Sequence, residues 1–194
     1  MIAYITGAPA AGKSTLCERL SLLPNVRHFP YSARLRDHIS VRLGRTLSEA
    51  DMRESSARLI SPDDVKAVDA ALATEIEDVR RVSGHLLVDS HPVTKEQFGF
   101  RVTPFSVAEL NKLAFDRLVC LYAAPDVLAT RIKDDPQGRP LPTEFELHIH
   151  AQLQMAVLAQ YAVLSGRHCY LVDSDISREE LGQQVAKLLK LTTD

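Results

Sequence analysis

One segment near the start of the chain constrains the fold more than any other. Residues 7–14 read Gly-Ala-Pro-Ala-Ala-Gly-Lys-Ser and directly follow residues 1–6, an apolar run suited to a buried parallel strand. Residues 15–20 then have helical periodicity. Strand, glycine-rich turn and helix in this order form a P-loop, whose backbone N–H groups surround a phosphate at the positive end of the helix dipole. The segment therefore predicts nucleotide binding.

The P-loop also predicts roles for individual residues. Lys13 would reach the β- and γ-phosphate oxygens of the donor and is a predicted catalytic residue. Ser14 would offer its hydroxyl to Mg²⁺. We expect ATP to contact the whole loop and the start of the helix, that is Gly7, Ala8, Pro9, Ala10, Ala11, Gly12, Lys13, Ser14 and Thr15.

Length and composition favour a protein that acts on small molecules. A chain of 194 residues fits one domain, and it contains no apolar run near the ~20 residues of a membrane span. Met1 leads straight into a strand without a signal-peptide pattern, which predicts a cytoplasmic location. A net charge of -2 gives no basic field for nucleic acid. Three widely spaced cysteines favour reduced, buried thiols. We expect neither nucleic-acid nor membrane partners, with self-association left open.

Apolar runs alternate with helical patterns along the chain. Helix-start signals with a capping partner occur at Ser61, Ser106, Thr143 and Ser177. Residues 92–105 lack periodicity, so we expect a long ordered loop there. The predicted strands are residues 1–6, 26–29, 85–91, 117–123 and 168–172. This alternation predicts an α/β domain with three α/β/α layers, in which the five parallel strands lie in the order 2-3-1-4-5.

Several polar residues follow the predicted strands. Asp89 lies near the carboxyl end of the third predicted strand and would be close to the P-loop, and His91 follows at the same edge of the sheet, where ligands bind in open α/β folds. Arg131 and Arg139 stand on either side of Pro136 and Gly138 in a proline-rich loop, residues 134–142, as a closing lid of a small-molecule kinase requires.

Two further polar groups also have simpler explanations. The chain's basic cluster could bind a phosphorylated substrate, although a solvated helix face is an equal alternative for each of its arginines, Arg34, Arg36, Arg42 and Arg45. His148 and His150 are two residues apart on a predicted helix and so point to different faces. A metal pair on a helix needs a spacing of three or four, which argues against histidine ligands here.

The sequence resembles the archaeal-type adenylate kinases, within the P-loop nucleoside monophosphate kinases, along nearly its whole length. Beyond the P-loop, the resemblance rests on Asp51-Met52-Arg53, Leu87-Val88-Asp89-Ser90-His91, Gly99-Phe100, residues 131–139 and residues 161–166. It implies an ATP:AMP phosphotransferase within a single domain, residues 1–194. That domain would include an acceptor-binding part around residues 30–84 and a short lid without zinc around residues 134–142.

The resemblance also implies roles on the acceptor side. Arg53 would grip the acceptor phosphate, and Tyr31 and Ser32 would lie by the acceptor nucleoside. His91 would border this site. Arg34 is a further expected contact, which comes from the basic cluster and not from the resemblance, because the Arg34/Arg36 pair departs from the family pattern.

On the donor side, Asp89 would hold Mg²⁺ through water. Arg131 and Arg139 would stabilise the transferring phosphoryl group. Asp175 and Ile176 would pass over the ATP adenine.

Two alternatives remain open from the sequence. The family pattern carries a further basic residue after the lid, where this chain has Gln152, Gln154 and Met155, so another monophosphate or a small phosphorylated metabolite could be the acceptor. A nucleotide-dependent switch that hydrolyses ATP or GTP slowly is the competing class. The arginines that flank the lid favour a kinase, and Asn111-Lys112-Leu113-Ala114 lacks the aspartate of a guanine-reading signature.

Overall fold

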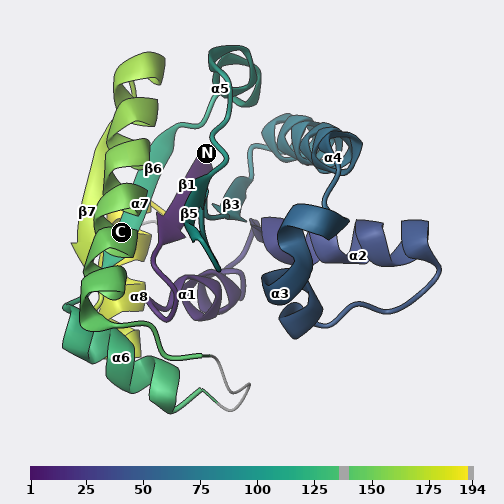
Figure 1. The fold of residues 1–194 in the computed structure, drawn as a ribbon. Helices are drawn as coiled ribbons and strands as arrows, with labels where there is room; N and C mark the ends of the chain where they lie inside the picture. Colours follow the sequence, from purple (N-terminus) through teal and green to yellow (C-terminus); the bar gives the residue numbers. More distant parts are fainter. Residues whose placement is uncertain (136–139, 192–194) are drawn as a thin grey trace.

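The computed structural model describes residues 1–135 and 140–191, with side chains for all of these except 53–57. Its central feature is a parallel sheet made of β1 (Ile2–Gly7), β2 (Val26–Pro30), β3 (His85–Asp89), β6 (Arg117–Tyr122) and β7 (Cys169–Asp173). These strands lie side by side in the order β2-β3-β1-β6-β7 (Figure 1). Counted along the chain, this is the predicted order 2-3-1-4-5, which is confirmed.

Helices cover both faces of this sheet. Side chains alternate along β1, so that Ile2 and Tyr4 enter one core cluster and Ala3 and Ile5 enter the other. The first cluster is covered mainly by α4 (Pro62–Arg81), α5 (Val107–Leu113) and α7 (Glu144–Ser165), and the second by α1 (Lys13–Leu20), α6 (Pro125–Lys133) and α8 (Arg178–Leu189). Figure 1 shows α7 in front of the sheet and α8 behind it. The three predicted layers are therefore present.

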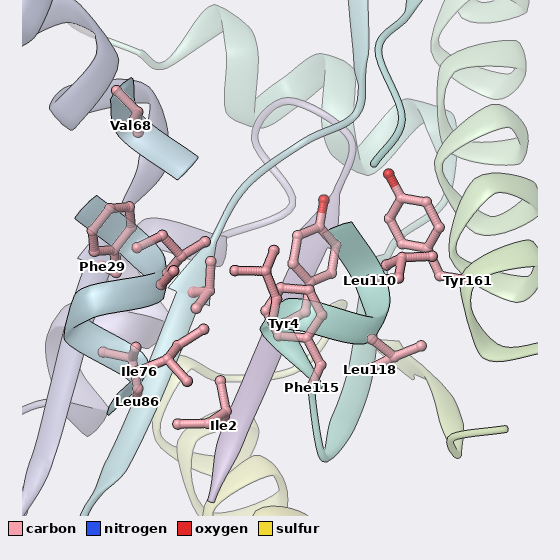
Figure 2. Close-up of a cluster of buried hydrophobic side chains, with 14 of the residues drawn as sticks. Ile2, Tyr4, Phe29, Val68, Ile76, Leu86, Leu110, Phe115, Leu118 and Tyr161 are labelled. Carbon is pink, nitrogen blue, oxygen red and sulfur yellow. The ribbon is translucent and has the colours of Figure 1, made fainter. Parts of the chain in front are cut away.

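An aromatic group forms the centre of the first cluster (Figure 2). The Tyr4 ring centroid lies 5.2 Å from that of Phe115 and 5.9 Å from that of Tyr161. The hydroxyl of Tyr161 accepts a 2.7 Å hydrogen bond from the backbone N–H of Phe105. Tyr161 of α7 thus packs against Tyr4 of β1 and also fixes the start of the segment that leads into α5.

All four predicted capping sites begin helices. The hydroxyls of Ser61, Ser106, Thr143 and Ser177 each accept a hydrogen bond from the backbone three residues later, and the acidic side chain at that position returns one.

Two further helices, α2 (Tyr31–Leu43) and α3 (Glu49–Leu59), lie with α4 beside the β2 end of the sheet (Figure 1).

The prediction for residues 92–105 was wrong in part. Residues expected to form a loop instead contain a hairpin of β4 (Val93–Glu96) and β5 (Gly99–Val102), which pair only with each other as an antiparallel sheet. Each strand has four residues, which is too short to show a clear alternation of polar and apolar residues. The polar residues of the hairpin also have charged partners, since Lys95 lies 3.1 Å from Glu146 and Arg101 lies 3.0 Å from Glu96.

Two smaller observations complete the fold. Among the described residues, no helix has the length and apolar character needed to cross a membrane. All three cysteines are free, and burial raises the pKa of Cys17 and raises that of Cys120 to about 12. Thiols with such a high pKa are weak nucleophiles, so neither of these two has the properties of a catalytic cysteine.

Candidate active site

The P-loop is shaped by its two glycines. At Gly7 the chain passes so close to β6 that a Cβ would lie 2.4 Å from the carbonyl oxygen of Leu121, and only glycine fits such an approach. Gly12, with a φ of 89°, precedes α1 in the left-handed conformation and has no side chain to cap the helix. The first N–H groups of α1 are therefore available to an anion, as the motif predicts.

Ser14 and Asp89 meet beside this loop. The Ser14 hydroxyl donates a 2.6 Å hydrogen bond to Oδ2 of Asp89, which ends β3 and is only 7% exposed. Burial by itself would raise the pKa of Asp89, but His28, Lys13 and Ser14 together lower it below the ordinary value. The carboxylate is therefore ionised at neutral pH despite its burial.

These two side chains fit a magnesium ion. A hydroxyl and an ionised carboxylate are the hard oxygen ligands that Mg²⁺ prefers, and this ion usually keeps water and phosphate oxygens as further ligands. Nε2 of His28 lies 3.9 Å from Oδ2 of Asp89 and supports that carboxylate from β2. Within the part of the chain that the structure describes, no group of three or more His, Cys, Asp or Glu side chains is placed to hold a metal ion.

The sheet register places Asp89 between two functional segments. Asp89 lies opposite Ile5 of β1 on one side and opposite Pro30 of β2 on the other. β1 leads into the P-loop, whereas β2 leads directly into α2. The predicted donor and acceptor sides thus meet at the carboxyl end of β3.

The described donor-side residues beyond the P-loop also lie together. The Arg131 guanidinium donates hydrogen bonds of 2.7 Å to the carbonyl oxygen and 3.3 Å to Oγ of Ser174, and it lies 4.0 Å from Oδ1 of Asp175. Ser174 is buried and bonds in turn to the carbonyl oxygen of Tyr122. Asp175 is exposed and Ile176 half-buried. Arg139 lies outside the described residues.

On the predicted acceptor side, α2 is tied to α4. The Tyr31 hydroxyl donates a 2.7 Å hydrogen bond to Asp69. The Arg34 guanidinium lies 3.9 Å from Glu75 and 5.4 Å from the centroid of the Phe29 ring.

The other acceptor candidates differ in what the structure describes. Ser32 and His91 are exposed. The side chain of Arg53 lies outside the described part of the structure. The structure therefore places Tyr31, Ser32 and Arg34 on one helix and His91 two residues after Asp89.

Two arginines of the basic cluster have acidic partners within this group of helices. Arg42 makes hydrogen bonds of 2.8 and 3.1 Å to the two carboxylate oxygens of Asp64, which is 1% exposed. Arg36 lies 3.4 Å from Asp37 and 3.7 Å from Glu49. These contacts join α2 to α3 and α4, which gives the two arginines a structural role.

A buried polar network was not predicted from the sequence. Thr6, just before the P-loop, donates a 3.0 Å hydrogen bond to Oε1 of Gln154 on α7. Nε2 of Gln154 and Nε2 of His150 each lie 3.1 Å from the carbonyl oxygen of Val93. The available signal was the spacing of Glu146, His150 and Gln154, which are polar residues four apart on one helix, but Glu144, His148 and Gln152 have the same spacing. His150 is buried and His148 is exposed, so the two point to different faces as predicted.

The sequence is similar to a known family and to characterised proteins. A family model described as AAA domain matches residues 6–148. An adenylate kinase of Pyrococcus furiosus is 26% identical over 100% of this chain and 97% of its own length. An adenylate kinase of Methanothermobacter thermautotrophicus is 24% identical over 85% of each chain.

Solved structures show a shared fold. A shikimate kinase from Bacteroides thetaiotaomicron superimposes with a TM-score of 0.55 and 18% identity, covering 98% of each chain. The Deinococcus radiodurans tunicamycin resistance protein gives a TM-score of 0.60 and 15% identity, covering 98% of this chain and 96% of its own. Because the family model covers well over half of the sequence, the chain belongs to the AAA_17 family of AAA domains, with the P-loop kinase fold of an ATP-dependent phosphotransferase.

Proposed function

We propose that this chain is a nucleoside monophosphate kinase that transfers the γ-phosphoryl group of ATP to AMP, giving two ADP. The observation that carries the proposal is the position of Asp89, between the strand that enters the P-loop and the strand that enters α2. A reaction between two nucleotides needs their phosphates to meet at one point, and this edge of the sheet offers such a point. The adenylate kinases among the relatives support the choice of AMP.

On the donor side, the P-loop N–H groups and Lys13 would hold the ATP phosphates. Ser14 and Asp89 would hold Mg²⁺, which neutralises charge on the β- and γ-phosphates when it is bound. Arg131 and Arg139 would stabilise the transferring group, with Asp175 and Ile176 over the adenine.

On the acceptor side, the residues around 30–84 would bind AMP through Arg53, Tyr31, Ser32 and Arg34, with His91 at its border. An oxygen of the acceptor phosphate attacks the γ-phosphorus in line, and ADP leaves. The reaction needs no covalent enzyme intermediate, because positioning and charge stabilisation supply the catalysis. The lid around residues 134–142 would exclude water from the transfer.

A different acceptor is the second candidate. In α7, Gln152 is exposed, while Gln154 is buried and occupied by the bonds to Thr6 and Val93. None of the three residues Gln152, Gln154 and Met155 carries the positive charge that the adenylate kinase resemblance leads one to expect here. Another nucleoside monophosphate or a small phosphorylated metabolite is therefore included in the test.

The experiment is a coupled assay of ADP formation from Mg-ATP with AMP, GMP, CMP, UMP and dTMP in turn, followed by product analysis. We expect AMP to give the highest kcat/KM. A preference for another monophosphate would replace AMP but keep the reaction class. Slow hydrolysis that no acceptor accelerates would instead indicate the switch.

A further inference from the structure

Among the described residues, the β4–β5 hairpin forms no strand pair with the main sheet, and one helix, α7, makes polar contacts with it. Beyond β4 lies α7, on which Glu146, His150 and Gln154 form a row because they are four residues apart. Each of the three contacts the hairpin. Glu146 pairs with Lys95 at 3.1 Å, and the other two reach the carbonyl oxygen of Val93.

Gln154 differs from Glu146 and His150 because its side chain bonds both to the hairpin and to β1. Its Oε1 accepts the hydrogen bond from Thr6, and its Nε2 donates to the carbonyl oxygen of Val93. Gln154 is 1% exposed, and both Thr6 and Val93 are fully buried. Thr6 immediately precedes Gly7 of the P-loop. Val93 follows His91 by two residues, so one side-chain amide joins the donor loop to the segment that leaves the carboxyl end of β3.

The hydrogen-bonding chemistry fixes the orientation of this amide. A backbone carbonyl can only accept, so the side-chain NH₂ must face Val93 and the oxygen must face the Thr6 hydroxyl. The Val93 carbonyl has two lone pairs and accepts from His150 as well, which makes Nε2 the protonated nitrogen of that ring. The 3.4 Å approach of the Gln154 and His150 nitrogens then joins two donors and is not a hydrogen bond.

Such a network is costly unless every member is paired. A buried amide or carbonyl that loses its partner retains the full penalty of leaving water. An apolar side chain at position 154 would leave the Thr6 hydroxyl without this acceptor and the Val93 carbonyl with one donor fewer. A complete network instead permits one arrangement of its parts, because each bond constrains both direction and distance.

We propose that Gln154 is a positioning residue for phosphoryl transfer, which sets the distance between the P-loop and the segment from Asp89 to the hairpin. The inference rests on the proposed kinase function for its kinetic consequence. Gln154 acts through Thr6 and Val93 and contacts no reacting atom. Its loss should therefore lower kcat and leave ATP binding nearly intact, because the phosphate-binding N–H groups remain in place.

The test compares Gln154→Met with Gln160→Met, the same change at an exposed position of the same helix. In Gln154→Met we expect amide hydrogens of residues 93–102 to exchange at least about tenfold faster, while those of β1, β3 and β6 keep their protection. We also expect kcat to fall roughly tenfold with KM for ATP within about twofold. Gln160→Met should match the wild type in both measurements.

A second variant removes the partner instead. Thr6→Val should lower kcat by a similar factor, and the Thr6→Val/Gln154→Met double variant should lose little more than either single variant, because one link is broken in each case. Multiplicative losses would overturn the proposal. Faster exchange over the whole sheet, with a lower Tm and a normal kcat, would also overturn it, since it would show a structural role alone.

The two proposals can fail separately. If the wild type showed no acceptor-dependent turnover, the kinase proposal would fail, and hydrogen exchange alone would decide whether Gln154 holds the hairpin to the P-loop strand. Unchanged exchange of residues 93–102 in Gln154→Met would overturn the inference whatever the enzyme does.

Discussion

Lys13 opens α1 and is close enough to Asp89 for its positive charge to lower the pKa of that carboxyl. We predict that Lys13→Ala loses at least about 100-fold in kcat, or roughly 3 kcal/mol of transition-state stabilisation, because the lysine serves the β- and γ-phosphates. The change in Tm should stay within about 2 °C, since the side chain packs no core. Steady-state kinetics and thermal unfolding measure both, with exposed Lys66→Ala as control. A variant that keeps more than about a tenth of the rate would contradict the P-loop assignment.

Arg131 has two roles that can be tested separately. Its guanidinium bonds to Ser174, next to the residues proposed to cover the adenine, and its charge would stabilise the transferring phosphoryl group. Its guanidinium holds Ser174 by two hydrogen bonds, which a lysine cannot reproduce. We predict that Arg131→Ala raises KM for ATP about tenfold and also lowers kcat. Arg131→Lys should recover part of kcat, because the charge returns, but not KM. Initial rates at varied ATP decide this, with exposed Lys133→Ala as control. A normal KM in Arg131→Ala would show that the contact with Ser174 does not serve ATP binding.

At the scale of elements, the buried Asp64 joins α2 to the start of α4. Its carboxylate accepts two hydrogen bonds from Arg42 and caps α4 through Ser61. We predict that Arg42→Met lowers the free energy of unfolding by about 1–2 kcal/mol, a value below that for fully buried pairs because the arginine is partly exposed. Urea unfolding with an unchanged m value would show it, with exposed Arg45→Met as control. Equal stability of Arg42→Met and wild type would show that the Arg42–Asp64 pair does not stabilise the fold.

The elements that the sequence predicted well are those with local signals. Strands of continuous apolar residues and capping boxes three residues apart depend only on neighbours in the chain, and all of them are present. The prediction of a loop at residues 92–105 missed the β4–β5 hairpin, because the polar residues of the hairpin pair with α7 and with each other. A local sequence pattern does not reveal such partners. The meeting of Ser14 with Asp89 could be predicted because parallel strands end at the same edge of a sheet.

Contacts that are distant in sequence limited the prediction of the site. Thr6 and Gln154 are 148 residues apart, and Gln154 and Val93 are 61 residues apart. The position of His28 beside Asp89 depends in the same way on the register of β2 against β3. Residue type alone marks none of these as partners, because a glutamine on a helix is usually exposed. The structure was needed to show that Gln154 is enclosed.

At the scale of the whole molecule, the buried His150 and the half-buried His85 make stability depend on pH. Burial, together with Lys13 and Lys95, lowers the pKa of His150 below its ordinary value of 6.5, although the bond to Val93 opposes this. Burial and the N-terminal ammonium lower the pKa of His85 as well. In the unfolded chain both rings take up a proton near pH 6.5. Below that pH the unfolded state therefore binds more protons than the folded state, and the free energy of unfolding falls as the pH falls.

The contribution of His150 can be isolated by a matched pair of variants. Above pH 6.5 the ring is neutral in both states and gives no slope, whereas between pH 6.5 and its lower folded pKa it contributes up to about 1.4 kcal/mol per pH unit. Glutamine can still donate to the Val93 carbonyl but does not titrate, so His150→Gln should flatten the stability curve between pH 6.5 and 5.5, as measured by urea unfolding. His148→Gln, at an exposed position, should leave the slope as it is. A slope that survives His150→Gln would assign the acid sensitivity to His85 and the carboxylates, and would mean that burial does not keep His150 neutral.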